Sequence, residues 1–157
     1  MLDKTDKSIL ELLQRDATLS VAEIAAHVHL SATPCWRRIQ RLEEQGYILR
    51  RVAILDAAKL NLGVTVFVSI RTSHHSEDWF EKFHRVVSAI PEVVEFYRMS
   101  GDVDYLLRIV VPDIQRYDWV YKQLIRGTDL FDVSSSFAME QLKLTTELPL
   151  AYAMATP

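Results

Sequence analysis

Ser31-Ala-Thr-Pro-Cys-Trp-Arg-Arg-Ile-Gln-Arg-Leu-Glu-Glu-Gln-Gly46 carries the start and stop signals of a single helix. Ser31 can accept hydrogen bonds from the first free amides of a helix, and Pro34 fits in a first turn. Gly46 can take the left-handed conformation that ends a helix. The stretch is therefore predicted to form one helix of about three and a half turns.

The two sides of this helix differ in chemistry. Apolar positions recur at spacings of four and three and are expected to face a core: Cys35, Ile39 and Leu42, with Trp36 beside them. The arginines fall on the other side: Arg37, Arg38 and Arg41. A narrow polar tip at Ser31, Ala32 and Thr33 could approach base edges, and guanidinium groups can reach phosphates or guanine. A surface helix with solvated arginines is the alternative.

The flanking segments favour the DNA-binding interpretation. Asp3 fits the N-cap of a helix over Leu2–Leu13, and Ser20-Val-Ala-Glu23 matches a capping box for a second helix that ends near His27. Only about four residues separate the second helix from the one at Ser31, which is typical of a helix-turn-helix. Tyr47–Leu55 is β-rich, and its Arg50 and Arg51 suit a wing strand laid against the DNA backbone.

The C-terminal half has a different pattern. A linker at 56–63 with room for one turn of helix comes first. Strands and helices are then predicted in the order βαββαβ, with these bounds: Val64–Thr72, Ser76–Ile90, Val93–Met99, Tyr105–Val111, Ile114–Arg126 and Phe137–Leu144. This is the ferredoxin-like plan, one antiparallel sheet with both helices on one face. Phe67, Leu106 and Val110 are expected on the uncovered face, where a second copy would pack.

Composition limits the class of protein. The 157 residues include 49% hydrophobic residues, and the net charge of −3 argues against non-specific coating of nucleic acid. The excess of arginine is confined to the stretch from His29 to Arg51. No run of about 18 apolar residues exists, so a cytoplasmic, nucleoid-associated protein without membrane contact is expected. Cys35 is the only cysteine, which excludes an intramolecular disulfide and a CxxC metal site.

In their order and spacing, the helix-turn-helix segment Ser31–Ile48 and the later Gly101-Asp-Val-Asp-Tyr-Leu-Leu107 resemble the Lrp/AsnC family of bacterial and archaeal transcription regulators. Three stretches are most similar to its cysteine-responsive, DecR-like subgroup: Thr33–Trp36, His74–Ser76 and Ser135–Gln141. The resemblance covers essentially the whole chain. It implies a winged helix-turn-helix domain at 1–55, a linker at 56–63 and a RAM or ACT-like effector domain at 64–157. It also implies homodimers that assemble into octamers or similar rings.

The resemblance further implies that a small amino acid binds between effector domains. The positions that it assigns to this site are Met99, Gly101, Asp102, Asp104, Tyr105, Ser134, Ser135 and Ser136. Glycine lets a backbone approach the ligand, aspartate can pair with an α-ammonium group, and serine can hold a carboxylate. Thr128-Asp129 replaces a Pro-Gly pair that is common in the family. If the glycine of that pair helps to admit the ligand in relatives, Asp129 could narrow the pocket or change its charge.

The sequence supports a sequence-specific regulator of amino-acid metabolism that binds an operator in double-stranded DNA. The residues expected to contact DNA are Ser31, Ala32, Thr33, Trp36, Arg37, Arg38, Arg41, Arg50 and Arg51. No catalytic residue, metal site or cofactor is expected. Asp102 and Asp104 suit turn or ligand roles, and His74 and His75 suit a solvated loop. Cys35 suits a packed thiol better than a redox sensor. The alternative is a small ferredoxin-like enzyme or metabolic regulatory subunit with a helical appendage.

Overall fold

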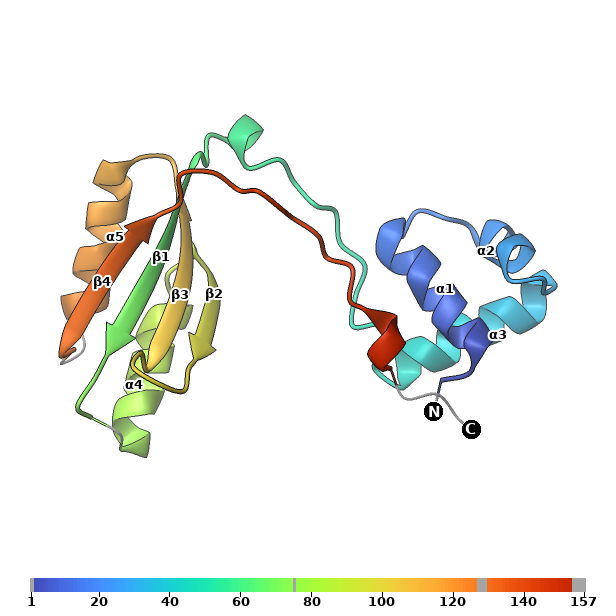
Figure 1. Cartoon of the computed structure of the whole chain (residues 1–157), viewed down its shortest axis with the longest axis horizontal. Coiled ribbons are helices and arrows are strands. Elements are labelled where there is room, and N and C mark those ends of the chain that lie inside the picture. The colour runs from blue at the N-terminus through green and yellow to red at the C-terminus, as the bar shows by residue number, and fades with distance from the viewer. Residues whose placement is uncertain (1, 75, 127–129, 154–157) are drawn as a thin grey trace. The chain divides into compact units, whose positions relative to one another are not determined.

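The computed structural model describes residues 2–74, 76–126 and 130–153, and the chain in it divides into two units (Figure 1). The helical unit comprises residues up to 54 together with those from 143 onward, and the sheet unit comprises residues 55–142. This division differs from the expected one, which gave everything after residue 63 to a single effector domain. The end of the chain returns to the helical unit because residues 147–153 bond to its first helix.

Three helices build the helical unit: α1 (Lys4–Arg15), α2 (Val21–His27) and α3 (Ala32–Glu44). The N-caps predicted for α1 and α2 are confirmed, since Asp3 and Asp6 form a capping box on α1, as Ser20 and Glu23 do on α2. The helices enclose a small apolar core made of Leu2, Ile9, Leu13, Ile24, Ala25, Cys35, Ile39 and Leu42. The 3.6-residue periodicity therefore identified the buried side of α3 correctly.

Left-handed residues end the two helices of the helix-turn-helix. His29 has φ 55°, and the Leu30 amide donates to the Ala25 carbonyl at 2.9 Å. Gly46 has φ 75°, and the Tyr47 amide donates to the Leu42 carbonyl at 2.9 Å. These are Schellman closures, in which a positive φ lets late amides satisfy the last free carbonyls of a helix. Gly46 thus ends α3 as predicted, and the short turn after α2 fixes where α3 begins.

Three expectations for this unit were wrong. Ser31 occupies the N-cap of α3, but its side chain makes no capping hydrogen bond. Trp36 does not join the core, since it is 51% exposed. The wing strand is not formed either, because residues 49–56 are neither helix nor strand. A strand needs a hydrogen-bonding neighbour, and the strands in the described part of the chain all pair with one another in the sheet unit.

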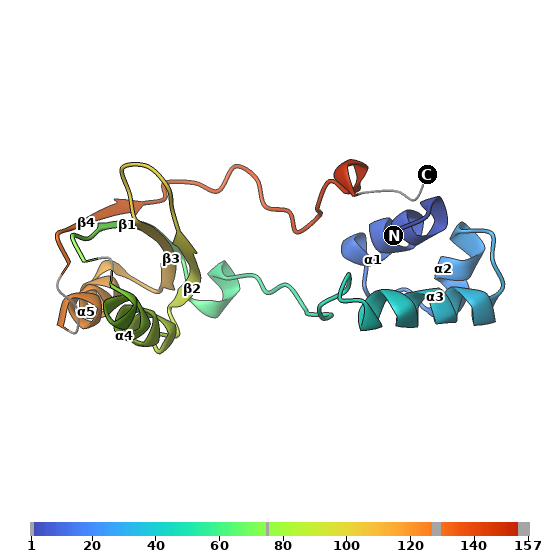
Figure 2. The ribbon, with the colours of Figure 1, turned by 90° about the horizontal axis from the view of Figure 1, so that it is seen from below.

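The sheet unit follows the predicted βαββαβ order: β1 (Val64–Arg71), α4 (Glu77–Ser88), β2 (Val93–Arg98), β3 (Tyr105–Val111), α5 (Ile114–Arg126) and β4 (Asp132–Phe137). The linker before it contains a single turn of 3-10 helix at Ala58–Leu60. The four strands form an antiparallel sheet in the order β2-β3-β1-β4, and both helices cover one face of it (Figure 2).

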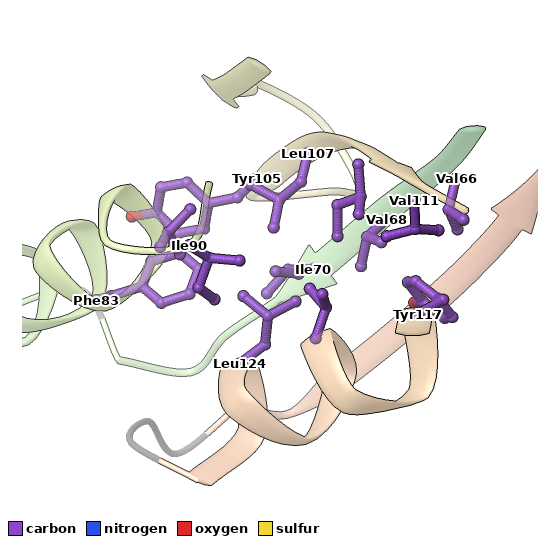
Figure 3. Packing of buried hydrophobic residues seen from close by; sticks show 13 residues of the cluster. Val66, Val68, Ile70, Phe83, Ile90, Tyr105, Leu107, Val111, Tyr117 and Leu124 are labelled. Carbon is purple, nitrogen blue, oxygen red and sulfur yellow. The ribbon is translucent and has the colours of Figure 1, made fainter. Parts of the chain in front are cut away.

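The core of this unit lies between the sheet and the two helices. Alternate residues of β1 and β3 point toward α4 and α5, so Val66, Val68 and Leu107 are completely buried (Figure 3). Phe83 and Leu124 contribute from the helices. Ile114, the first residue of α5, lies outside this core and is 66% exposed. The opposite face of the sheet is open in the single chain, as expected, and leaves Phe67 39% exposed.

The last strand lies five residues before its predicted position. Its residues Val133, Ser135 and Phe137 pair with Ile70, Val68 and Val66 of β1, and the Ala138 amide makes the final ladder bond to the Thr65 carbonyl. Because β1 begins at Val64, residues beyond 138 find no strand to pair with. The β-prone composition of Phe137–Leu144 therefore does not become a strand. Among the described helices, none has the length and apolar character that crossing a membrane would require.

Candidate nucleic-acid interface and effector site

The exposed surface of α3 begins at its N-terminal tip. Ser31, Ala32 and Thr33 are all exposed there, and one turn later Trp36 and Arg37 are exposed as well. Arg37 has no ion-pair or hydrogen-bond partner among the residues that the structure describes. With its hydroxyl free of any capping role, Ser31 adds a polar group to the tip. The tip can therefore offer hydroxyls, amides and one guanidinium group to a DNA groove.

Arg38 and Arg41 are placed differently from Arg37. The Nη1 atom of Arg38 lies 2.5 Å from an oxygen of Asp3 and 2.8 Å from one of Asp6. The Nη2 atom of Arg41 lies 2.8 and 2.7 Å from the two oxygens of Asp6. Both arginines thus turn toward the start of α1 and hold α3 against it. The expectation that all three arginines point away from the rest of the unit was wrong for these two.

The electrostatics of this cluster agree with its geometry. Hydrogen bonds that Arg38 donates to Asp3 and Asp6 raise its pKa, although partial burial opposes them. Burial also opposes the charge on Asp3, but bonds from the Asp6 amide and from Arg38 outweigh it, so the pKa of Asp3 lies below its usual range. The lowered pKa of Asp3 and the raised pKa of Arg38 both favour the charged forms that their ion pair requires.

The two arginines beyond α3 also differ from each other. Arg51 forms an ion pair with Glu43, with Nη2 2.9 Å from the carboxylate. Arg50 is exposed and has no partner within the described ranges. Of the five arginines expected to contact DNA, only Arg37 and Arg50 thus have no carboxylate partner in the described part of the chain, and of these two Arg37 lies on α3.

The loop between β2 and β3 is the centre of the predicted effector site. Gly101 has φ 106°, a conformation that side chains disfavour, and the loop is closed by a bond of 2.8 Å from the Met99 amide to the Asp104 carbonyl. The Asp104 carboxylate accepts the Thr72 amide at 2.8 Å, and the Asp104 amide donates to the Ile70 carbonyl at 3.0 Å. Asp104 therefore ties the loop to the end of β1.

The eight predicted effector positions do not share one surface. Tyr105 is only 5% exposed and packs among aromatic rings of the core, where burial raises the pKa of its hydroxyl. Ser135 faces the helices and hydrogen-bonds to Tyr117. Ser134 and Ser136 lie on the open face, opposite Ser69 and Phe67 of β1. Asp129, expected to alter the pocket, lies outside the described residues.

One end of the sheet nevertheless brings several of these positions together. The loop 99–104 and the start of β4 flank the end of β1, because Ile70 pairs with both Tyr105 and Val133. Met99, Gly101 and Asp102 are exposed there, and Asp102 has no partner within the described part of the chain. Sequence reasoning missed Arg71, which is the last residue of β1 and therefore lies at the same edge. Its guanidinium carbon lies 5.8 Å from the ring centre of Phe131. Its place at the end of an alternating strand was the available signal.

Other chemistries find little support. In the part of the chain that the structure describes, no three His, Cys, Asp or Glu side chains gather as a metal site would require. The amide of His74 bonds to the Thr72 hydroxyl at 3.0 Å, and His75 is outside the described residues. Cys35 is completely buried, and burial raises the pKa of its thiol, as the packed interpretation predicts. A buried, protonated thiol is unsuited to redox sensing.

Comparisons with known proteins agree with this architecture. A family profile described as "Winged helix-turn-helix DNA-binding" matches residues 2–48, and one described as "Lrp/AsnC ligand binding domain" matches residues 65–148. The chain belongs to the Lrp/AsnC family. It is a DNA-binding transcriptional regulator of that family and not an enzyme.

Similarity to individual Lrp/AsnC proteins extends over nearly the whole chain. The "DNA-binding transcriptional activator DecR" of Escherichia coli (strain K12) is 52% identical over 151 residues, which cover 96% of this chain and 99% of DecR. The crystal structure of an AsnC family transcriptional regulator from Agrobacterium tumefaciens is 63% identical with a TM-score of 0.94, covering 98% of this chain and 100% of that one. A transcriptional regulator from Neisseria meningitidis, solved as a complex with L-methionine, is 34% identical with a TM-score of 0.92 and coverages of 98% and 100%.

Proposed function

We propose that this Lrp/AsnC regulator binds its operator through the exposed tip of α3 and changes its activity when a small amino acid binds at the 99–104 end of the sheet. It acts in the cytoplasm, at the nucleoid. The observation that carries the DNA half is Arg37, which has no partner among the described residues and lies one turn behind the exposed tip Ser31–Thr33. Donors in this arrangement reach base edges and phosphates when the second helix of a helix-turn-helix enters the major groove.

Two factors support an amino acid as effector. The Neisseria meningitidis relative was solved with L-methionine, and it is similar to this chain along nearly the full length of both. In this chain, Asp102 is an exposed carboxylate without a partner among the described residues, and it stands beside Gly101. A free carboxylate can pair with an α-ammonium group, and a glycine lets ligand atoms approach the backbone. Small sulfur-containing amino acids are the first candidates.

A second copy of the chain is needed to complete the molecule. The open face of the sheet carries Phe67, Leu106 and Val110, and Tyr97 lies opposite Leu106 on the edge strand β2. An apolar sheet face with no covering helix is typical of an interface. A two-fold dimer also presents two copies of α3, as a symmetric operator requires. We extend this proposal to octamers or similar rings of dimers.

The DNA half is tested with duplexes selected from a random pool by the wild-type protein. Arg37→Ala should lower affinity for the selected duplex about tenfold or more, because a base contact is worth about 1–3 kcal/mol. Arg85→Ala is the matched control, since Arg85 is an exposed arginine on α4 of the sheet unit. Equal affinities of the two variants in fluorescence anisotropy would contradict the proposed role of the α3 tip.

The effector half is tested by a thermal-shift screen of the twenty amino acids. A ligand that binds only the folded protein raises its melting temperature in proportion to RT ln(1 + [L]/Kd). A shift with one small amino acid would support the proposal and identify the effector. If none of the twenty shifts the transition at concentrations of about 10 mM, the effector is not a free amino acid and that half of the proposal is wrong.

A further inference from the structure

Four charged side chains form a chain of ion pairs between α1 and α3, which we term the α1–α3 charge cluster: Asp3, Arg38, Asp6 and Arg41. Asp6 is its centre, because its two oxygens accept bonds from both arginines at 2.7–2.8 Å. Its side chain is only 1% exposed, whereas those of Arg38 and Arg41 are 29% and 46% exposed. The cluster thus joins a buried carboxylate to two arginines of the helix that reads DNA.

We propose that Asp6 is a positioning residue that limits the sequence-independent affinity for DNA, because it withholds the charges of Arg38 and Arg41 from DNA phosphates. The inference rests on the DNA-binding function of the family and adds to it a division of labour among three neighbouring arginines. Arg37 is available to DNA, whereas Arg38 and Arg41 are neutralised within the protein. Asp6 contacts no DNA in this proposal and acts only through the two arginines.

The burial of Asp6 explains why its partners stay in place. A carboxylate removed from water needs charged partners, and taking them away leaves an uncompensated buried charge. If both arginines turned to DNA, Asp6 would lose all of its guanidinium partners at once. Exchanging these bonds for solvent-exposed phosphate contacts is therefore unfavourable. Asp3 strengthens the arrangement, because it accepts a bond from the same Nη1 atom of Arg38 that bonds to Asp6, and Asp3 is itself the N-cap of α1.

The consequence for DNA binding follows from the source of non-specific affinity. Binding to random DNA comes almost entirely from phosphate neutralisation, while specificity comes from base edges and DNA shape. Two additional free arginines on α3 would strengthen binding to every sequence by a similar factor. By neutralising them, Asp6 lowers non-specific affinity and leaves the contacts of the α3 tip unchanged. A factor common to all sequences cancels in the ratio of specific to non-specific affinity, so Asp6 sets the total affinity for DNA and its salt dependence, whereas the α3 tip sets the ratio.

The decisive variant is Asp6→Asn, which keeps an oxygen acceptor for the Asp3 amide in the capping box but removes the charge that holds the arginines. Glu11→Gln is the matched control, because it removes one negative charge from the exposed side of the same helix, and Glu11 has no arginine partner within the described residues. Both full-length proteins are titrated by fluorescence anisotropy with a random-sequence 40-base-pair duplex and with a duplex selected by the wild-type protein.

Each newly formed phosphate contact steepens the dependence of log K on log [salt] by about 0.9. With both arginines released, Asp6→Asn should steepen the slope for the random duplex by about 1.8, so that raising salt from 50 to 200 mM weakens its binding about twelvefold more than it weakens the wild type. Affinity for the selected duplex should change by a similar factor, so the ratio of the two affinities should stay close to that of the wild type. A purely structural role of Asp6 would weaken binding to both duplexes without steepening the slope.

A folded Asp6→Asn protein with the wild-type slope, or with the slope of Glu11→Gln, would overturn the proposal. If Asp6→Asn does not fold, Arg41→Gln decides, since Asp6 then still has Arg38 as its partner. That variant should keep the wild-type slope, and a slope shallower by about 0.9 would show that Arg41 already contacts phosphate. Failure of the wild-type protein to bind either duplex would instead contradict the DNA-binding function itself.

Discussion

Replacing Asp104 separates two roles that the sequence alone combines. The resemblance to the Lrp/AsnC family assigns this residue to the effector, but the structure uses one of its oxygens to accept the amide of Thr72, which is only 7% exposed. Asp104→Ala leaves that amide without an acceptor. A bond to a charged acceptor contributes about 1.5–3 kcal/mol, and leaving a buried donor unpaired costs a similar amount. For a unit of this size, the loss corresponds to a fall of about 10 °C in melting temperature.

Asp104→Asn is the informative companion variant. It keeps an oxygen that can accept the Thr72 amide, so about half of the stabilisation should remain, because bonds to ionised groups are roughly twice as strong as neutral ones. The loop 99–104 then keeps its shape. We expect Asp104→Asn to retain effector affinity within a few-fold, whereas Asp104→Ala loses both stability and affinity. Asp102→Asn should show the opposite pattern, with normal melting and weakened effector binding, since Asp102 is exposed and unpaired in the described chain.

Differential scanning calorimetry measures the stability of the sheet unit in the three variants, and isothermal titration with the amino acid found in the screen measures their affinity. The reasoning is refuted if Asp104→Asn melts like the wild type but loses the effector as fully as Asp104→Ala. In that case the Asp104 charge itself would contact the ligand. A melting temperature of Asp104→Ala within about 2 °C of the wild type would refute the tether to Thr72 separately.

Two further predictions concern pH and the end of the chain. A hydrogen bond from Arg108 holds the pKa of Glu95 below its usual range, although burial opposes it. The stabilisation that the Glu95–Arg108 pair gives to the folded sheet unit is therefore present above about pH 4.5, and it is lost as the pH falls through the lowered pKa of Glu95. Glu95→Gln should flatten the acid dependence of sheet-unit melting below that pH, and an unchanged curve would contradict the assignment. The side chain of Gln14 donates to the Leu148 carbonyl at 3.1 Å and accepts the Leu148 amide at 2.9 Å. Gln14→Ala should speed amide exchange in residues 147–153 several-fold, and unchanged exchange would show that other contacts hold this segment.

Local sequence signals predicted the helices and most strands well, because caps and periodicity are local. Asp3, Ser20 and Gly46 end or begin their helices through atoms only a few residues away. The position of β4 could not be read in the same way. Its bounds are set by the length of β1, whose partner positions are filled by Asp132–Phe137. Strand propensity in 137–144 could not reveal that no pairing positions were left.

The effector positions show the same limit at the scale of single residues. Successive residues of a strand point to opposite faces, so a register shift of one residue exchanges the serines that face the core for those that face outward. Ser135 lies toward the helices because Val133 and Phe137 do, and Ser134 and Ser136 therefore lie on the open face. The sequence could name the three serines but could not say which of them were accessible.

The arginines of α3 show why a helical face is not enough to assign function. Arg37, Arg38 and Arg41 all avoid the apolar side of the helix, and periodicity treats them alike. What separates them is Asp6, which lies 32 and 35 residues away from its two partners along the chain. A buried acid at the start of α1 selects two of the three arginines, because only those two reach it from the turns of α3 that pack against α1. The surface left for DNA is thus defined as much by which charges the fold neutralises as by which it exposes. A reader helix with fewer free charges binds every DNA sequence less tightly, and more of its total affinity then comes from the base contacts of its tip.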